Sequence, residues 1–456
     1  MRLAATCVLL WVAFSPRLNA QSGPVLVFEH ATVIEATDRP PLADVSVTIR
    51  GAVIESIRPT GDAPAIGRLP GTTVVDASGK FMIPGLWDMH AHLFALDKAF
   101  PVLIANGITG VRDMYSGNAP RAYAPWRNRP DSVRFVVSGM IDGPVRPESP
   151  GAILVSNADE ARLGVELLAA NGAEFIKVYS SLSREAYLAL AAEARRIGIP
   201  FAGHVPETVS PAEAAEAGQL SQEHLINILL ASSTKEDELR AARLALLTDP
   251  ALSAPERARL FGFPPEEGLL DTYDPPKAAA LFETLANYGV WQTPTLVVLK
   301  RYAEAGPEIL KTPYMQDLPA DKLAEFKAHV TRLLKRYEQL VGDMHRVGIQ
   351  FLAGTDTSPA TGIPLGESLH DELELLVESG LTPLEALQSA TRSPAFYFGV
   401  LSVMGTVEAG KSADLVLLDA NPLDDIRNTR KIRSVVMRGR YYPRETLDAM
   451  LAANAK

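Results

Sequence analysis

The sequence of 456 residues contains a single cysteine, Cys7. A disulfide framework within the chain is therefore excluded, and so is a metal site built from several thiolates. Positive charge is also scarce, because 44 Lys and Arg face 54 Asp and Glu, and the net charge of −10 excludes a general nucleic-acid-binding protein. After residue 20 we find no apolar run long enough for a membrane-spanning helix. A hydrophobic content of 47% excludes a disordered chain, so these exclusions favour a folded enzyme.

Residues 1–20 differ from the rest of the chain. Arg2 provides a basic start, residues 3–14 are apolar, and the small residue Ala20 offers a cleavage point before Gln21. This pattern predicts a signal peptide over 1–20 and an exported protein, secreted or periplasmic. The alternative is a buried N-terminal helix. Cleavage after Ala20 would remove Cys7 and leave a mature chain without cysteine.

The two ends of the remaining chain are rich in strand-forming residues. Alternating apolar runs occupy 25–75, with Gly51 as a turn, and return at 413–420 and 432–442. Strand groups at opposite ends of a sequence can form one module that encloses what lies between them. We therefore predict a small β-sandwich from residues 25–80 and 400–445.

The middle of the chain alternates strand-like runs with helical patterns such as 158–172 and 184–198. The candidate strands are 82–90, 109–114, 134–141, 175–180, 199–205, 220–225, 291–299 and 349–356. Eight such units with helical crossovers are the number that closes a parallel barrel, so we predict an α/β fold, a (β/α)8 TIM barrel, over 81–399. The long connections 231–275 and 300–348 predict either a cover over the active-site face or longer outer helices.

Histidines gather at the carboxyl ends of the predicted strands, where barrel active sites are built. His90 and His92 end the first strand, and alternate residues of a strand point the same way, so both imidazoles can reach one metal ion. His204 ends the fifth strand, His224 the sixth and Asp356 the eighth. Each alone is more typical of a structural polar group, but together they predict a metal site at one mouth of the barrel.

Lys177 stands inside the otherwise apolar fourth strand, FIKVYS. A buried ammonium group is costly without a partner. One interpretation pairs it with a carboxylate, Asp356 or Glu174. The other has the neutral amine, favoured by burial, react with carbon dioxide to form a carbamate that bridges two metal ions. The neighbouring histidines favour the carbamate.

The run PGLWDMHAH, the strand lysine Lys177, His204, His224 and the GTD of Asp356 resemble the amidohydrolase superfamily. GTVEAGKSADLVLLD at 405–419 is similar to the segment by which that superfamily returns from barrel to β-sandwich. Within it, the lysine in KVY is similar to the binuclear, imidazolonepropionase-like branch that includes prolidase-type dipeptidases and ochratoxin-type amidases. The resemblance covers roughly residues 25–445.

The resemblance implies two divalent metal ions. His90, His92 and Asp356 would hold one, His204 and His224 the other, and carbamylated Lys177 would bridge them. A hydroxide between the metals would attack the scissile carbonyl, with Asp356 as general acid and base. Zinc is the first expectation from these ligands, with Mn, Co or Fe as alternatives.

Other polar residues leave two interpretations open. Tyr179 lies two residues after Lys177, so strand alternation aims it to the same side, where it either binds substrate or is a partly buried barrel tyrosine. Arg112 and Asp113 are expected to form a structural ion pair at the end of the second strand. His370 is expected to pack or cap a helix rather than to bind metal.

We therefore predict an exported, metal-dependent hydrolase that cleaves an amide bond, with a dipeptide or an N-acyl amino acid as the leading substrate class. The alternative within enzymes is a lactone, ester or cyclic amide hydrolase on the same metal centre. The non-enzyme alternative is a periplasmic metal-binding scaffold that has lost catalysis. The expected partner is a small-molecule substrate, with no nucleic acid and no membrane span, and assembly into a homo-oligomer is left open.

Overall fold

The computed structural model describes residues 23–62, 71–144, 151–249, 251–252, 267–312, 315 and 318–454. The predicted signal peptide at 1–20, with Cys7, lies outside these described residues. Within the described part of the chain, no helix has the length and apolar character to cross a bilayer.

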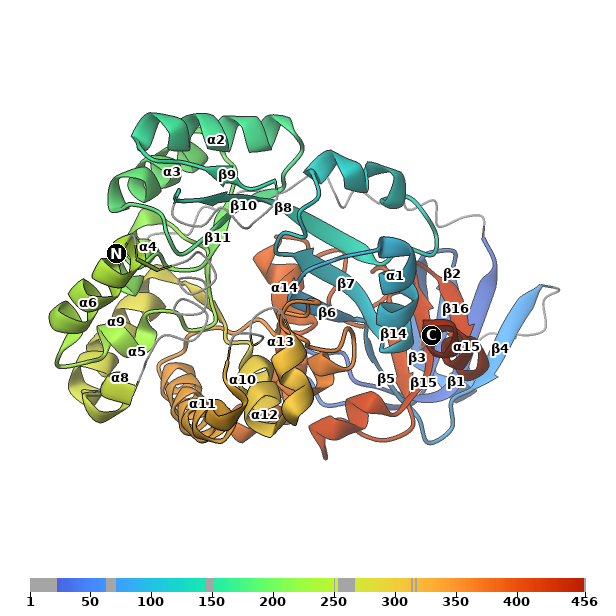
Figure 1. The fold of residues 1–456 in the computed structure, drawn as a ribbon. Coiled ribbons are helices and arrows are strands. Elements are labelled where there is room, and N and C mark those ends of the chain that lie inside the picture. Colours follow the sequence, from blue (N-terminus) through green and yellow to red (C-terminus); the bar gives the residue numbers. More distant parts are fainter. Residues whose placement is uncertain are drawn as a thin grey trace.

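A parallel barrel forms the larger part of the molecule (Figure 1). Consecutive strands of the chain are neighbours in it, as is usual for β–α–β units with short connections. In order they are β6 (Leu86–Ala91), β7 (Ile108–Asp113), β8 (Arg134–Asp142), β10 (Phe175–Val178), β11 (Phe201–Gly203), β12 (Ser221–Glu223) and β13 (Trp291–Thr293), with the short β9 (Ile153–Leu154) on β8.

The eighth predicted strand closes this barrel as an irregular segment. Phe351 forms a parallel bridge with Gln292 of β13, and Thr357 forms one with Ala91 of β6. Between them, the backbone N–H of Met89 donates to the carbonyl of Ala353 at 2.8 Å. Residues 349–357 therefore lie between the last and first strands, and the predicted (β/α)8 architecture is confirmed.

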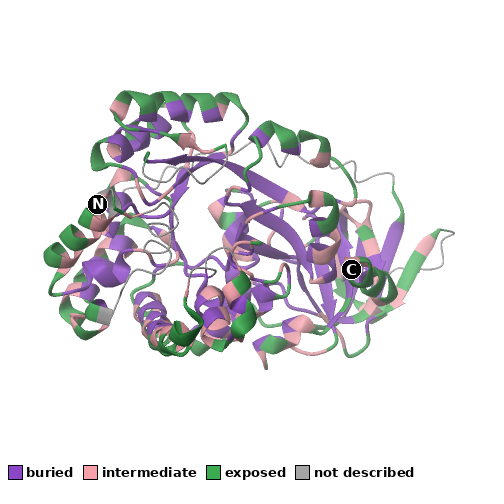
Figure 2. Ribbon diagram, in the orientation of Figure 1, coloured by how far each residue is buried: buried purple, intermediate pink, exposed green. Residues whose placement is uncertain are grey.

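Helices surround the barrel, with their buried faces toward the strands and their exposed faces outward (Figure 2). Local capping sets several of their ends: the Asn157 side chain accepts from Glu160 N–H at the start of α2, and Gly198 ends α3 with φ 77°. The helices are α1 (Leu96–Ala105), α2 (Ala158–Ala170), α3 (Arg184–Ile197), α4 (Pro211–Ala217), α5 (Ile228–Ala231), α6 (Glu236–Thr248), α8 (Glu267–Asp271), α9 (Pro275–Tyr288), α10 (Leu296–Glu304), α11 (Leu323–Arg346), α12 (Ser368–Glu378), α13 (Pro383–Ser389) and α14 (Arg392–Tyr397).

A second, mostly antiparallel sheet joins the two ends of the described chain (Figure 1). Its buried face includes Phe28, Val47, Ile54 and Leu415. Phe81–Pro84 pairs with β1 and β14, so this segment lies in the second sheet and the barrel begins at Leu86. The strand order is β16 (Arg440–Pro443), β15 (Ile432–Met437), β14 (Leu415–Leu418), β5 (Phe81–Pro84), β1 (Val25–Val33), β2 (Leu42–Arg50) and β3 (Val53–Pro59), with β4 (Thr72–Asp76) also on β1 and helix α15 (Arg444–Asn454) after β16.

One predicted strand is shorter in the structure than expected, and one long connection is decided between its two interpretations. The strand expected over 291–299 is only three residues long, because Pro294 has no N–H to continue the ladder and α10 begins at Leu296. The connection 300–348 holds the 24-residue α11, whose buried face includes Leu333, Tyr337 and Leu340. That connection is a long outer helix, the second of the two interpretations that the sequence left open.

Candidate active site

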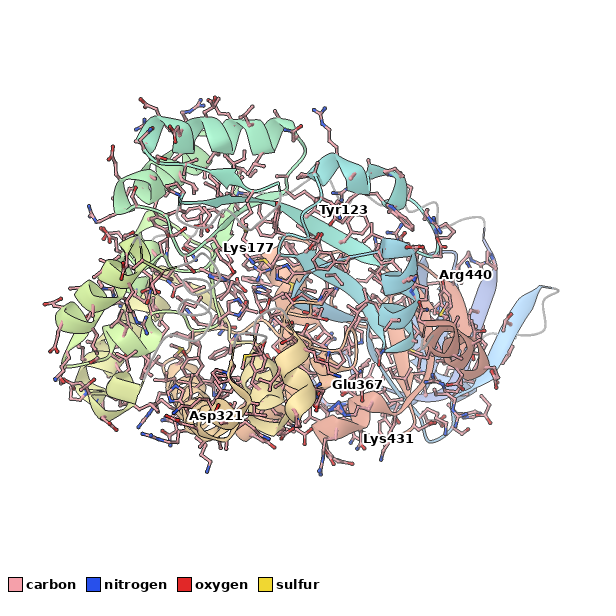
Figure 3. The ribbon with its side chains drawn as sticks, viewed as in Figure 1. Tyr123, Lys177, Asp321, Glu367, Lys431 and Arg440 are labelled. Carbon is pink, nitrogen blue, oxygen red and sulfur yellow. The ribbon has the colours of Figure 1, made fainter. Side chains whose placement is uncertain are left out.

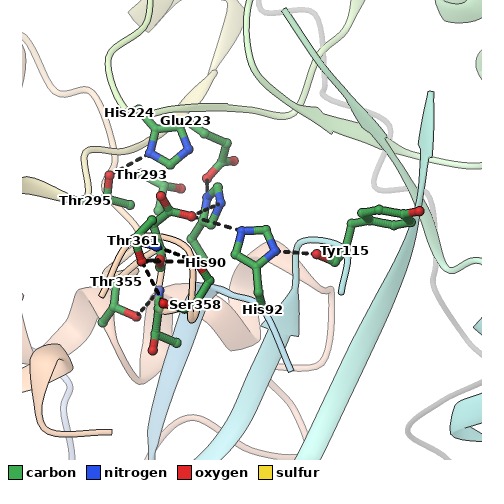
Figure 4. A network of polar contacts seen from close by, with 12 residues as sticks. His90, His92, Tyr115, Glu223, His224, Thr293, Thr295, Thr355, Ser358 and Thr361 are labelled. Carbon is green, nitrogen blue, oxygen red and sulfur yellow. Dashed lines mark hydrogen bonds and ion pairs between the residues drawn. The ribbon is translucent and has the colours of Figure 1, made fainter. Parts of the chain in front are cut away.

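His90 lies near the end of β6 and His92 directly follows that strand (Figure 4), and the imidazoles of both meet the carboxylate of Asp356. Nε2 of His92 is 3.0 Å and Nε2 of His90 is 3.4 Å from Asp356 Oδ1. The approach depends on Gly354, where an added Cβ would stand 2.7 Å from His90 Cβ. The side chain of His90 is fully buried, and those of His92 and Asp356 are 16% and 18% exposed, so the cluster opens toward one side only.

His204 and His224 follow directly after β11 and β12. Together with His90 and His92 they form a group of four neighbouring imidazoles. The centroid of His224 is 4.5 Å from that of His90 and 5.0 Å from that of His204. His224 has a left-handed backbone, φ 61°, which turns its side chain inward where the strand ends. The structure therefore brings together the five histidine and aspartate residues that the sequence placed at separate strand ends.

Lys177 lies in the barrel strand β10 and is 2% exposed (Figure 3), and its charge acts on His90 and His224. Burial lowers its pKa to about 8, against the opposing charges of Asp356, Glu223 and Asp113. Of the two carboxylates considered as its partner, Glu174 pairs with Arg127 at 2.7 Å and Asp356 with His92 at 3.0 Å. Both of those carboxylates therefore have partners other than Lys177, whose pKa is lowered by burial.

All four histidines share one feature, which is that the Nδ1 atom is engaged by a protein oxygen. A metal bound by any of them would therefore be bound through Nε2. The partners are Glu223 Oε2 for His90 at 2.8 Å, the carbonyl of Tyr115 for His92, Ser180 Oγ for His204 at 2.7 Å and Thr295 Oγ1 for His224 at 2.7 Å.

The oxygen partner of His90 belongs to a buried ion pair. Nη2 of Arg112 donates to both carboxylate oxygens of Glu223, at 2.9 and 3.0 Å, and neither side chain is exposed. The expected pair of Arg112 with Asp113 is therefore wrong. Asp113 instead accepts hydrogen bonds from the hydroxyls of Ser116 and Tyr123, because its strand position aims it away from the guanidinium group.

The electrostatics of the cluster suit cation binding. Burial, followed by the charges of His224 and Lys177, lowers the pKa of His90 well below its usual value, so this imidazole is neutral. Burial alone would raise the pKa of Asp356, but the charge of His224 and the hydrogen bond from His92 lower it overall. His90 Nε2 is buried without a hydrogen-bond partner among the described residues. Neutral nitrogen donors beside an ionised carboxylate are the ligands that zinc prefers.

Two further predicted residues are placed by the structure. The Tyr179 ring stacks on His204 with centroids 4.0 Å apart, so it lies at the site. His370 lies in α12, fully buried, with Nδ1 2.9 Å from Thr429 Oγ1 and Nε2 3.2 Å from the carbonyl of Asn106. His370 therefore packs against Thr429 and Asn106, as expected, and does not belong to the group of four histidines at the site.

The residues that hold the Nδ1 atoms were missed by sequence reasoning. Glu223 could have been considered, because it is a carboxylate at the end of a predicted strand, directly before the candidate ligand His224. Ser180 and Thr295 are common loop residues with no distinguishing pattern. The carbonyl of Tyr115 has no sequence signature at all, since any residue supplies one.

The sequence profile of the amidohydrolase family matches residues 81–441, which include the barrel and strands β14 and β15. Ochratoxinase from Aspergillus niger is 30% identical over 130 residues, 28% of this chain and 25% of its own. Imidazolonepropionase from Mesorhizobium japonicum is 40% identical over 74 residues, 16% of this chain and 18% of its own. The matched part of this chain thus spans only 25% of the ochratoxinase.

Solved structures resemble the whole described architecture. A Xaa-Pro dipeptidase with methionine bound in its active site has a TM-score of 0.66 at 18% identity, covering 92% of this chain and 100% of its own. The ochratoxinase of A. niger has a TM-score of 0.64 at 19% identity, covering 92% and 96%. At these identities the similarity shows a common fold.

Proposed function

Because this chain belongs to the amidohydrolase family, we propose that it is a metal-dependent hydrolase of carbon–nitrogen bonds whose substrate is a dipeptide or an N-acyl amino acid. The dipeptidase and the ochratoxinase among its structural relatives support an amide as substrate. One observation carries the proposal: four histidines near the buried Lys177 site each have Nδ1 engaged by a protein oxygen, which would leave Nε2 to bind a metal ion.

The residues present fit two divalent ions. We assign His90, His92 and Asp356 to one ion, since their ligand atoms lie within 4.8 Å of one another. His204 and His224 belong to the other, and Lys177 lies with both groups. The neutral amine of Lys177 would add to carbon dioxide, forming a nitrogen–carbon bond and releasing a proton, and the carbamate would be a shared ligand. Zinc suits these donors, and such ions polarise a carbonyl and lower the pKa of water.

The chain's own residues handle the proton and the substrate. Asp356 would take a proton from the attacking water and pass it to the leaving amine. Its position among the proposed ligands supports this role, since its Oδ1 is 3.4 Å from Nε2 of His90 and 3.0 Å from Nε2 of His92. Tyr179, stacked on His204, would donate a hydrogen bond from its hydroxyl group to the carbonyl or carboxylate of the substrate. The leader-like segment 1–20 supports action outside the cytoplasm, in the periplasm or the medium.

The test begins with metal content, measured by elemental mass spectrometry on protein purified without chelator and with bicarbonate. We expect about two divalent ions per chain and hydrolysis of members of a panel of dipeptides and N-acyl amino acids. Two ions with turnover only on lactones or esters would favour the alternative enzyme. Two ions with no turnover on any amide or ester would favour a metal-binding scaffold, and no metal after reconstitution would overturn the proposal.

A further inference from the structure

The helix that follows β13 begins without a cap from its own N-terminal residue. Thr295 precedes α10 with φ 51° and ψ 43°, and its hydroxyl accepts no hydrogen bond from the first turn. The hydroxyl is used elsewhere, since Oγ1 is 2.7 Å from Nδ1 of His224. Figure 4 shows the two side chains facing each other.

An ordinary threonine cap elsewhere in the chain shows the contrast. Thr382 precedes α13 with φ −70° and ψ 157°, and its hydroxyl accepts from the N–H of Glu385 at 3.2 Å. Extended backbone is the usual conformation of a capping residue. The left-handed conformation of Thr295 therefore turns its hydroxyl away from α10 and toward the histidine.

The missing cap is supplied by a distant residue, Glu372 of α12. Its side chain is fully buried, and Oε2 accepts from the N–H of Val297 at 2.8 Å. The N–H groups of Leu296 and Thr295 also favour the charged form of this carboxyl, although burial raises its pKa to about 8. Oε1 has no hydrogen-bond partner among the described residues, so Glu372 serves the start of α10 alone.

We propose that Glu372 is a positioning residue for the metal ligand His224, because it caps α10 in place of Thr295 and leaves the Thr295 hydroxyl to hold His224 Nδ1. Without this acceptor, buried N–H groups at the start of α10 would lose their partner, which is costly. Thr295 could satisfy them only by adopting the extended backbone of a capping residue, which would withdraw its hydroxyl from His224.

The inference rests on the proposed metal centre, with His224 as a ligand. Loss of an outer partner of a metal-binding histidine lowers metal affinity by about 10- to 100-fold. We therefore expect Glu372→Met to weaken the binding of one of the two metal ions, the one assigned to His224, by about 10-fold. Glu372→Gln keeps an acceptor oxygen of the same reach and should rescue most of the affinity.

The experiment titrates metal-free protein with Co²⁺, using its visible absorption and competition with a chelator to obtain both dissociation constants. The matched control is Thr382→Ala, which removes an exposed helix cap and should lower the melting temperature without changing either constant. Thr295→Val tests the connection: if Glu372 acts through Thr295, Glu372→Met should add nothing to the loss that Thr295→Val causes alone. Should Glu372→Met fail to fold, Glu372→Asp takes its place, because the shorter carboxylate cannot reach Val297.

The outcomes separate the two proposals. Tight binding of two ions by Glu372→Met, with a lower melting temperature like that of Thr382→Ala, would reduce Glu372 to a structural cap and overturn this inference alone. Additive losses in the double variant would overturn it as well. Wild-type protein that binds no Co²⁺ would overturn the metal centre itself, and the inference with it.

Discussion

Nδ1 of His90 lies 2.8 Å from Oε2 of Glu223, and neither side chain is exposed to solvent. Both carboxylate oxygens of Glu223 in turn accept hydrogen bonds from Nη2 of Arg112. This chain of contacts fixes the imidazole in one orientation and one tautomer, with the proton on Nδ1 and the lone pair of Nε2 toward Asp356. The orientation of His90 is therefore determined by the buried pair of Glu223 and Arg112 behind it.

The first prediction concerns this contact. Glu223→Gln keeps the shape of the side chain but removes its charge, so the hydrogen bond to His90 weakens and Arg112 loses its counterion. We expect metal affinity to fall by about 10- to 100-fold. Chelator competition measures it. The control is Glu174→Gln, which breaks the pair with Arg127, and equal losses of metal in both variants would contradict a specific role.

Lys177→Ala removes the proposed shared ligand. We expect the variant to lose most of its metal and its activity, and added short-chain carboxylates to restore part of both by occupying the place of the carbamate. Metal analysis with and without acetate or propionate measures this. Unchanged metal content and turnover would contradict a two-metal centre bridged by Lys177.

Asp356→Asn separates binding from proton transfer. The amide oxygen can still face His92, but it cannot take a proton, so turnover should fall by about 10²- to 10⁴-fold while part of the metal is retained. Turnover under saturating substrate, normalised to bound metal, is the measurement. Activity that falls only in proportion to lost metal would argue against a role for Asp356 as acid and base.

Tyr179→Phe distinguishes a substrate contact from a barrel tyrosine. The phenyl ring keeps the stacking on His204, whose centroid is 4.0 Å away, so metal content should not change. Loss of one hydrogen bond to substrate should lower kcat/KM by about 10-fold. Steady-state kinetics on the dipeptide that the wild-type protein hydrolyses fastest measures this loss. An unchanged kcat/KM would show that Tyr179 is a packing residue.

Much of the site could be predicted because it follows strand ends. His90 and Lys177 lie on strands and His92 directly follows one, so alternation predicts their directions, and the parallel barrel then brings the ends together. The resemblance to amidohydrolases is confirmed by the family match over 81–441. The contacts that orient the imidazoles could not be predicted from the sequence, because they join distant parts of the chain. Thr295 takes a left-handed conformation that tertiary packing imposes, and Tyr115 contributes a backbone carbonyl.

The number and order of the β units in the fold could also be predicted, but the segments that depart from regular strand geometry could not. Counting apolar runs predicts eight β units. It does not predict that residues 349–357 close the barrel through isolated bridges instead of a regular strand. That segment departs from regular strand geometry because Gly354 packs against His90 and Asp356 has φ 56°. The irregularity places Asp356, a proposed ligand, so it reflects the site rather than the local propensity of the residues.

The last prediction concerns pH and a histidine outside the site. Burial lowers the pKa of His370 from 6.5 to about 3. The unfolded chain therefore takes up a proton near pH 6.5 that the folded chain does not accept until about pH 3. Because the unfolded state binds more protons across this window, the free energy of unfolding should decrease as the pH falls from 6.5 toward 3.

His370→Gln removes this titration while retaining a polar partner for Thr429. The variant's free energy of unfolding should depend less on pH, with a slope lower by up to about 1.4 kcal/mol per pH unit between pH 6 and 4. Urea unfolding at several pH values measures it. His30→Gln is the control: the exposed His30 has a raised pKa through Asp44, so any contribution has the opposite sign and is screened by solvent. Identical slopes for wild type and His370→Gln would show that His370 does not limit acid stability.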